Sequence, residues 1–168
     1  MTAALRLNAG TAAPQARDRM RLGMAQLSPF GLSEQWLLRA CGDRHWGLIA
    51  EGAGQTGTAF RDAQGHPVYA AFCATALRLS PPAGPLLGAD LRISSVLGEV
   101  APGRTGSLHL LEGPGGPLGR LAMISCFLRH DAGGSNRQLV KSGLPGLGPL
   151  AAAPAELIAL DGRARRRA

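Results

Sequence analysis

The feature that most constrains the fold is a change of hydrophobic period across the glycine-rich stretch 52–57. Before this stretch, apolar residues recur at helical spacing, with Ser33 as a favourable N-cap and Glu34 at the positive end of the helix dipole. After it, apolar residues follow a period of two, which is typical of strands. The pattern predicts one buried helix within residues 32–51, in one piece or two because Gly42 and Asp43 interrupt it, followed by strands.

Short loops rich in glycine and proline separate the strand-like segments, so neighbouring strands should be antiparallel. The predicted strands are 17–27, 58–62, 68–79, 91–100, 105–112 and 118–130. Segments 58–62 and 68–79 flank a predicted hairpin turn. Because 68–79 is apolar on both faces, we expect it at the centre of the sheet. The sequence thus predicts an α+β fold in which an antiparallel sheet wraps a central helix.

The 168 residues are enough for one domain. We expect a flexible N-terminus at 1–16, the folded domain at 17–131, and an extended C-terminal arm at 132–168 with a short helix and a basic tail. Part of the net charge of +7 belongs to that tail, which holds Arg163, Arg165, Arg166 and Arg167. The body is therefore only mildly basic, and the sequence does not favour nucleic-acid binding.

The cysteines and the hydropathy indicate a cytoplasmic protein. Cys41, Cys73 and Cys126 are odd in number and far apart, without a C-x-x-C motif or a secretory segment, which indicates reduced thiols. No apolar run approaches the ~18 residues of a membrane span. We expect no membrane association.

Two chemical motifs are weak. Residues 52–57 match G-x-G-x-x-G, but a turn follows where a dinucleotide-binding fold requires a helix, so we interpret them as a loop. His45, His66, His109 and His130 are scattered singly, so we expect no metal site and no cofactor.

A family resemblance adds to this interpretation. The run GMAQLSPFGLSEQWLLRACGDRHW at 23–46 and the run FRDAQGHPVYAAF at 60–72 resemble hot-dog-fold biosynthetic proteins related to the leinamycin-pathway acyltransferase/decarboxylase. A weaker likeness continues through GADLRISSV at 88–96 and SNRQL at 135–139. The resemblance covers most of residues 20–140 and implies the hot-dog fold, a helix wrapped in an antiparallel sheet.

The resemblance also implies an activity. This is acyl transfer, with decarboxylation, from a malonyl-type acyl-CoA thioester to an acyl carrier protein in polyketide-type biosynthesis. Tyr69 matches the acyl-carrying nucleophile of the family. Two departures stand out: AQLSPF at 25–30 replaces the polar loop linked with decarboxylation, and the chain has room for one hot-dog unit where we expect two.

Several polar residues are candidates for supporting Tyr69. A phenol needs a hydrogen-bonding neighbour to attack a thioester, and Ser28 and His45 are the candidates for that role. The free N–H groups after Ser33 can hold the thioester oxygen, so we expect Tyr69 to reach a pocket at the first helical turn. Asn136 and Arg137 are candidates for contacting the phosphates or amides of a pantetheine arm.

Other interpretations remain open at this stage. Glu34 and His45 also have purely structural interpretations, as a first-turn acid and as a packed histidine. A second functional hypothesis is a hot-dog thioesterase or dehydratase, which would use Glu34 as its general base. A third is a non-catalytic subunit that binds a carrier protein. One hot-dog sheet leaves an unpaired edge strand, so we also expect a homodimer joined edge to edge, or else a half that needs a partner.

Overall fold

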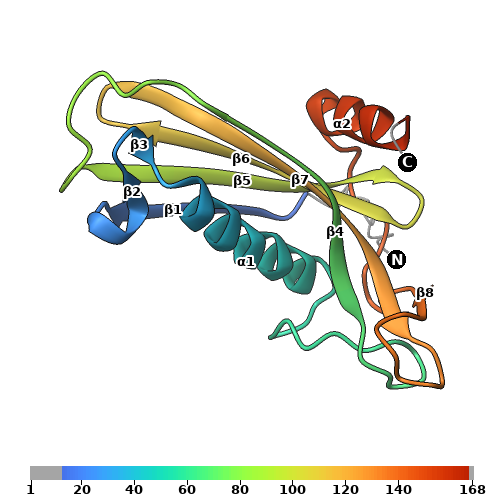
Figure 1. The fold of residues 1–168 in the computed structure, drawn as a ribbon. Coiled ribbons are helices and arrows are strands. Elements are labelled where there is room, and N and C mark those ends of the chain that lie inside the picture. The colour runs from blue at the N-terminus through green and yellow to red at the C-terminus, as the bar shows by residue number, and fades with distance from the viewer. Residues whose placement is uncertain (1–12, 167–168) are drawn as a thin grey trace, which may run out of the picture.

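The structure is a computed structural model, and it describes residues 13–166 (Figure 1). Its elements are β1 (Gln15–Arg21), the 3-10 helix η1 (Met24–Gln26), β2 (Leu27–Ser28), β3 (Gly31–Leu32), α1 (Glu34–Gly52), β4 (Tyr69–Leu79), β5 (Asp90–Ala101), β6 (Arg104–Gly113), β7 (Gly116–His130), β8 (Leu139–Lys141) and α2 (Ala155–Arg165). No helix in this described part is long and apolar enough to span a membrane.

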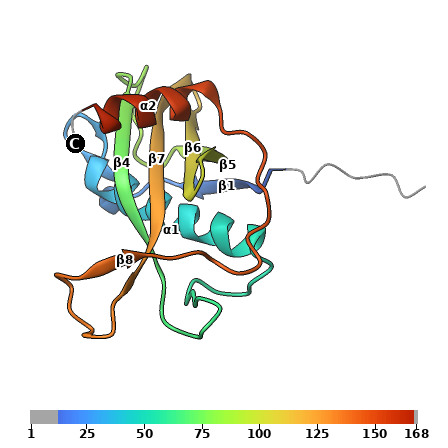
Figure 2. The same ribbon diagram turned by 90° about the vertical axis from the view of Figure 1, so that its right-hand side faces the viewer.

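The main sheet has the strand order β1-β5-β6-β7-β4, and each neighbouring pair is antiparallel. β8 adds to the far end of the long strand β7. Helix α1 lies against one face of the sheet, and α2 lies on the opposite, outer face (Figure 2). The predicted α+β architecture, a central helix wrapped by an antiparallel sheet, is confirmed.

Helix α1 is a single helix without a break. The Ser33 hydroxyl accepts the Trp36 N–H at 3.3 Å, as its predicted N-cap role requires. Gly42 and Asp43 do not interrupt the helix, and the ring of Phe72 packs 3.6 Å from where a Cβ of Gly42 would stand. The buried face includes Leu37, Cys41, Leu48 and Ile49, while Trp36 is only partly buried.

Strand β4 lies at the edge of the sheet, so the prediction of a central place was wrong. Among the described residues it pairs with β7 alone. Both its faces are apolar because Ala70 and Leu77 pack beneath α1, while Ala74 and Ala76 pack against the cluster that contains α2. Alternating hydrophobicity reports which faces are covered, and it does not report whether both backbone edges are paired.

Two segments before β4 also differ from prediction. The first strand is shorter than 17–27, because the chain leaves β1 at Arg21 and forms η1 and the β2–β3 hairpin. Segment 58–62 is not a strand: it makes one isolated bridge, between Arg61 and Pro67. The predicted turn between segment 58–62 and β4 is present, since the Asp62 N–H donates to the His66 carbonyl at 2.9 Å and Gly65 adopts a φ of 85°.

The chain after β8 crosses the end of the sheet and leads to α2. The Glu99 N–H donates to Ala151, and the Ala153 N–H donates back to Glu99, both at 2.9 Å. In α2, Leu157 and Leu160 pack against the outer face of the sheet. Of the predicted N-terminus 1–16, residues 1–12 lie outside the described part, while Gln15 and Ala16 belong to β1.

Candidate functional site

The start of α1 offers unused hydrogen-bond donors. The first N–H groups of a helix have no partner within it, and the Ser33 hydroxyl accepts only that of Trp36. The N–H groups of Glu34 and Gln35 therefore remain as donors beside the exposed Glu34 carboxylate. Ser28 lies in the hairpin before the helix, where its hydroxyl donates to the Gly31 carbonyl and accepts the Phe30 N–H, each at 3.3 Å. In this chain Ser28 holds that turn.

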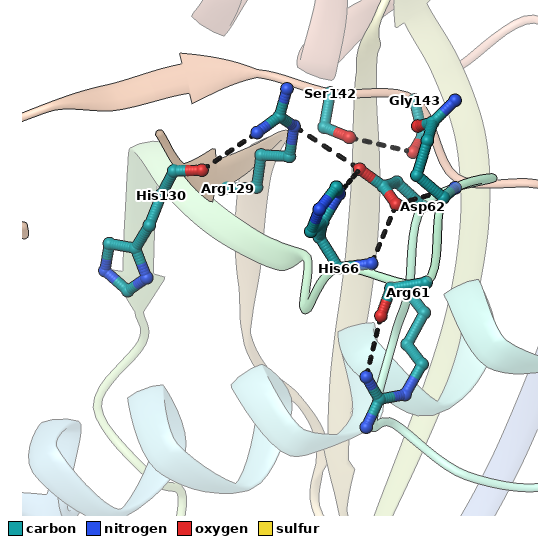
Figure 3. Close-up of polar contacts among 9 residues, drawn as sticks. Arg61, Asp62, His66, Arg129, His130, Ser142 and Gly143 are labelled. Carbon is teal, nitrogen blue, oxygen red and sulfur yellow. Dashed lines mark hydrogen bonds and ion pairs between the residues drawn. The ribbon is translucent and has the colours of Figure 1, made fainter. Parts of the chain in front are cut away.

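A second polar group lies where the chain enters β4 (Figure 3). Asp62 is buried at the centre of this group. Its Oδ2 accepts from the His66 ring at 3.1 Å and forms an ion pair with Arg129 Nε at 3.3 Å. Its Oδ1 accepts the N–H groups of Gln64 at 2.9 Å and His66 at 2.8 Å. The carboxylate thus fixes both the turn and the Arg129 side chain on β7.

The pKa of Asp62 is shifted downward. Burial raises the pKa, but the backbone N–H and the ring of His66, together with the Gln64 N–H, lower it by more. Asp62 is therefore ionised at neutral pH, and it holds the His66 ring in one orientation. An acid that orients an imidazole is a common arrangement in hydrolytic sites.

A cavity of about 470 Å³ adjoins this group. We call it the tip cavity, and its lining is Asp62, Ala63, Gln64, Arg129, Lys141, Ser142, Gly143, Leu144 and Pro145. Asp62 is the one acid in this lining, against the two cations Arg129 and Lys141.

Tyr69 does not lie at the first turn of α1 within one chain, so that expectation was wrong. Ala70 is buried beneath α1 and its carbonyl accepts the Trp46 indole N–H at 3.1 Å. Neighbouring side chains on a strand point to opposite faces, so Tyr69 lies on the face away from the helix. A helix rises about 1.5 Å per residue, so Trp46 is about 20 Å along α1 from Ser33.

The environment of Tyr69 includes two of the residues predicted or considered from the sequence. Its ring is 42 % exposed and meets the edge of the His130 ring, with centroids 5.5 Å apart. His130 Nε2 is hydrogen-bonded to Asn136 Oδ1 at 2.6 Å. Arg137 is exposed next to Asn136, in the loop between β7 and β8. The structure thus brings Asn136 close to Tyr69 through His130.

His45 cannot reach Tyr69, because it is fully buried between α1 and the sheet. Its Nδ1 is hydrogen-bonded to Ser107 and its Nε2 to Ser125, each at 2.7 Å. Ser107 also bonds the ring of His109, which in turn bonds Ser95, each at 2.8 Å. Burial, and then the nearby His109, lower the pKa of His45 to about 3. The packed interpretation of His45 fits this position.

Sequence reasoning missed the links among these side chains. It treated His66 and His109 as isolated, although Asp62 stands four positions before His66 across a turn. For the hydrogen-bond network of His109, the signal in the sequence was the presence of serines at inward-facing positions of the strands. Among residues 13–166, no group of three or more histidine, cysteine, aspartate and glutamate side chains is arranged to hold a metal ion.

Comparison with known proteins identifies the fold. No protein-family model and no curated protein sequence matches the chain. Among solved structures, a hot-dog-like protein from Thermanaerovibrio acidaminovorans superposes with a TM-score of 0.53 at 12% identity, covering 71% of this chain and 84% of that one. An acyl-ACP thioesterase from Bacteroides thetaiotaomicron gives a TM-score of 0.60 at 9% identity, covering 84% of this chain and 55% of that one.

A 1,4-dihydroxy-2-naphthoyl-CoA thioesterase from Synechocystis is a third structural neighbour. Its TM-score is 0.53 at 8% identity, covering 76% of this chain and 88% of that one. At these identities the likeness establishes the fold, and the chain has the hot-dog fold.

Proposed function

We propose that this hot-dog chain acts on acyl thioesters of coenzyme A or of an acyl carrier protein, by hydrolysis, as a homodimer. The observation that carries the proposal is that the free edge strand β4 has its C-terminal end beside the start of α1. The thioesterase structures among its neighbours support the same substrate class.

The edge of β4 favours pairing with a second copy. An edge strand presents unpaired N–H and C=O groups, and here Tyr69, Phe72 and Leu79 are also exposed along it. Two identical strands related by a two-fold axis run antiparallel. The Tyr69 end of one copy would then lie beside the Leu79 end of its partner.

That geometry would complete a site from two chains. Near the Leu79 end, Leu77 packs on the cluster that includes Leu37 and Trp36 of the first helical turns. In the same region, the backbone of Gly31 lies close to Pro82. In the dimer, the Tyr69 end of β4 in one copy would therefore lie near the start of α1 of the other.

The residues at the helix start suit hydrolysis. The N–H groups of Glu34 and Gln35 would stabilise negative charge as it develops on the thioester oxygen. The Glu34 carboxylate would take a proton from a water molecule, whose oxygen forms the new bond to the carbonyl carbon. The tetrahedral intermediate then breaks its C–S bond, the departing thiolate takes the proton back from Glu34, and the products are a carboxylic acid and a thiol.

Acyl transfer through Tyr69 is the second candidate, because the exposed phenol lies at the same proposed junction. In that reaction the phenol oxygen attacks the thioester carbonyl, releases the thiol and carries the acyl group until a second thiol accepts it. Decarboxylation and a polyketide-type pathway would belong to this candidate.

Intact-mass and thiol-release assays with a panel of acyl-CoA thioesters separate the candidates. Hydrolysis predicts that Glu34→Gln lowers thiol release about 100-fold, whereas Tyr69→Phe retains most of it. Glu51→Gln, at the other end of α1, is the matched control. An acyl adduct on the protein that Tyr69→Phe abolishes would establish acyl transfer instead. Carrier binding without any turnover would point to a non-catalytic subunit.

A further inference from the structure

The tip cavity has a marked excess of positive charge around it. Arg129 and Lys141 line it, and the exposed Arg61 and Arg137 lie in the two adjoining turns. The two acids of this region, Asp62 and Asp131, already have hydrogen-bonded partners. Asp62 accepts the three hydrogen bonds described above and pairs with Arg129, and Asp131 Oδ1 accepts the Gly133 N–H at 3.0 Å.

The Arg129 side chain is fixed in a conformation that can bind an anion. Its Nε pairs with Asp62 at 3.3 Å and its Nη1 donates to the His130 carbonyl at 3.0 Å (Figure 3). A guanidinium carries five N–H groups in a rigid fork, so several donors remain after these two contacts. Since Asp62 and the β7 backbone fix the fork, an incoming anion need not order it.

We propose that the tip cavity binds the phosphate of a phosphopantetheine arm, with Arg129 as its principal donor and Lys141 as a second cation. This rests on the proposed function, because coenzyme A and carrier-protein thioesters share that phosphate. Tyr69 and Lys141 are both in register with Leu128 of β7, so their backbones are two strand spacings apart, about 10 Å. A phosphate in the cavity thus lies near the β4 edge, from which the flexible arm would extend toward the helix start of the partner.

The test compares binding of pantetheine with that of 4′-phosphopantetheine by titration calorimetry, without any turnover. The two ligands differ only in the phosphate. We expect 4′-phosphopantetheine to bind the wild-type protein at least about tenfold more tightly, as one charge-assisted pair predicts. Arg129→Gln should abolish that difference, and Lys141→Gln should reduce it. The control Arg92→Gln removes one exposed charge from β5 and should retain the full difference.

Coenzyme A, as a third ligand, separates the two sources of the arm. Equal affinity for coenzyme A and 4′-phosphopantetheine means that the arm alone is recognised, as on a carrier protein. Tighter binding of coenzyme A, still lost in Arg129→Gln, adds contacts to the nucleotide. If wild type does not discriminate pantetheine from 4′-phosphopantetheine, or if folded Arg129→Gln and Lys141→Gln both do so fully, the proposal is overturned. These outcomes are independent of whether hydrolysis occurs, so the cavity and the catalytic proposal can fail separately.

Discussion

His45 of α1 and Ser125 of β7 are joined by a 2.7 Å hydrogen bond in the fully buried layer between helix and sheet. The other ring nitrogen bonds Ser107 of β6, so one imidazole ties the helix to two neighbouring strands. A neutral imidazole has one donor and one acceptor nitrogen, and both are satisfied here. The polar layer thus fixes how α1 sits on an otherwise apolar surface.

Acid should destabilise the protein through His45 and His109. Burial, as the main cause, lowers their pKa values from 6.5 to about 3 and about 4 in the folded state. The unfolded chain therefore binds protons first, and the stability is complete above pH 6.5 and falls as the pH drops toward the folded values. Each histidine should cost about 2 kcal/mol of unfolding free energy by about pH 5. Urea unfolding at neutral pH and at about pH 5 measures this, and equal free energies would contradict it.

Removing the Ser125 hydroxyl should weaken the same layer. Ser125→Ala leaves His45 Nε2 without this partner in a dry environment, at a cost of about 1–3 kcal/mol. Ser135→Ala, in the exposed loop before β8, should change the unfolding free energy by less than about 0.5 kcal/mol. Thermal and urea unfolding of the two variants provide the comparison. Equal effects would show that the buried hydrogen bond contributes nothing specific.

Charge placed at the middle of β4 should oppose self-association. Thr75 is exposed near the centre of this edge strand, where an antiparallel pairing would bring two copies together. Thr75→Lys would place like charges opposite each other, so the dimer should dissociate about tenfold more readily. Thr58→Lys adds the same charge at an exposed position outside the sheet. Light scattering across a dilution series decides, and a monomeric wild type would refute edge pairing.

A methyl group at Gly98 should displace the chain that leads to α2. The added Cβ would stand 2.6 Å from the Ala153 Cα and 2.9 Å from its nitrogen, and these backbone atoms cannot give way cheaply. Gly98→Ala should therefore cost about 1–3 kcal/mol and increase hydrogen exchange in α2. Gly57→Ala, where a Cβ meets nothing within 4 Å, is the control. Unchanged exchange in α2 would contradict the close approach.

The sequence predicted the elements that depend on local chemistry. A cap at Ser33 and helical spacing defined the start of α1, and a period of two located most of the sheet strands. Since these signals come from neighbours along the chain, they survive without tertiary context. Segment 58–62 failed as a strand because its alternation is short and only one bridge, at Arg61, pairs it.

Tertiary structure alone decided what the polar residues do. The apolar pattern of β4 shows that its faces are covered, but only the fold shows that α2 covers one of them and that the strand is an edge. The alternation of side chains placed Tyr69 away from the α1 of its own chain, and burial made His45 a partner of Ser107 and Ser125. Asp62, His66 and Arg129 come together because β7 returns past the turn before β4, a contact between positions far apart in the chain. Hydrophobic periodicity carries no record of which distant polar groups meet, since each such contact is set by strand order and register.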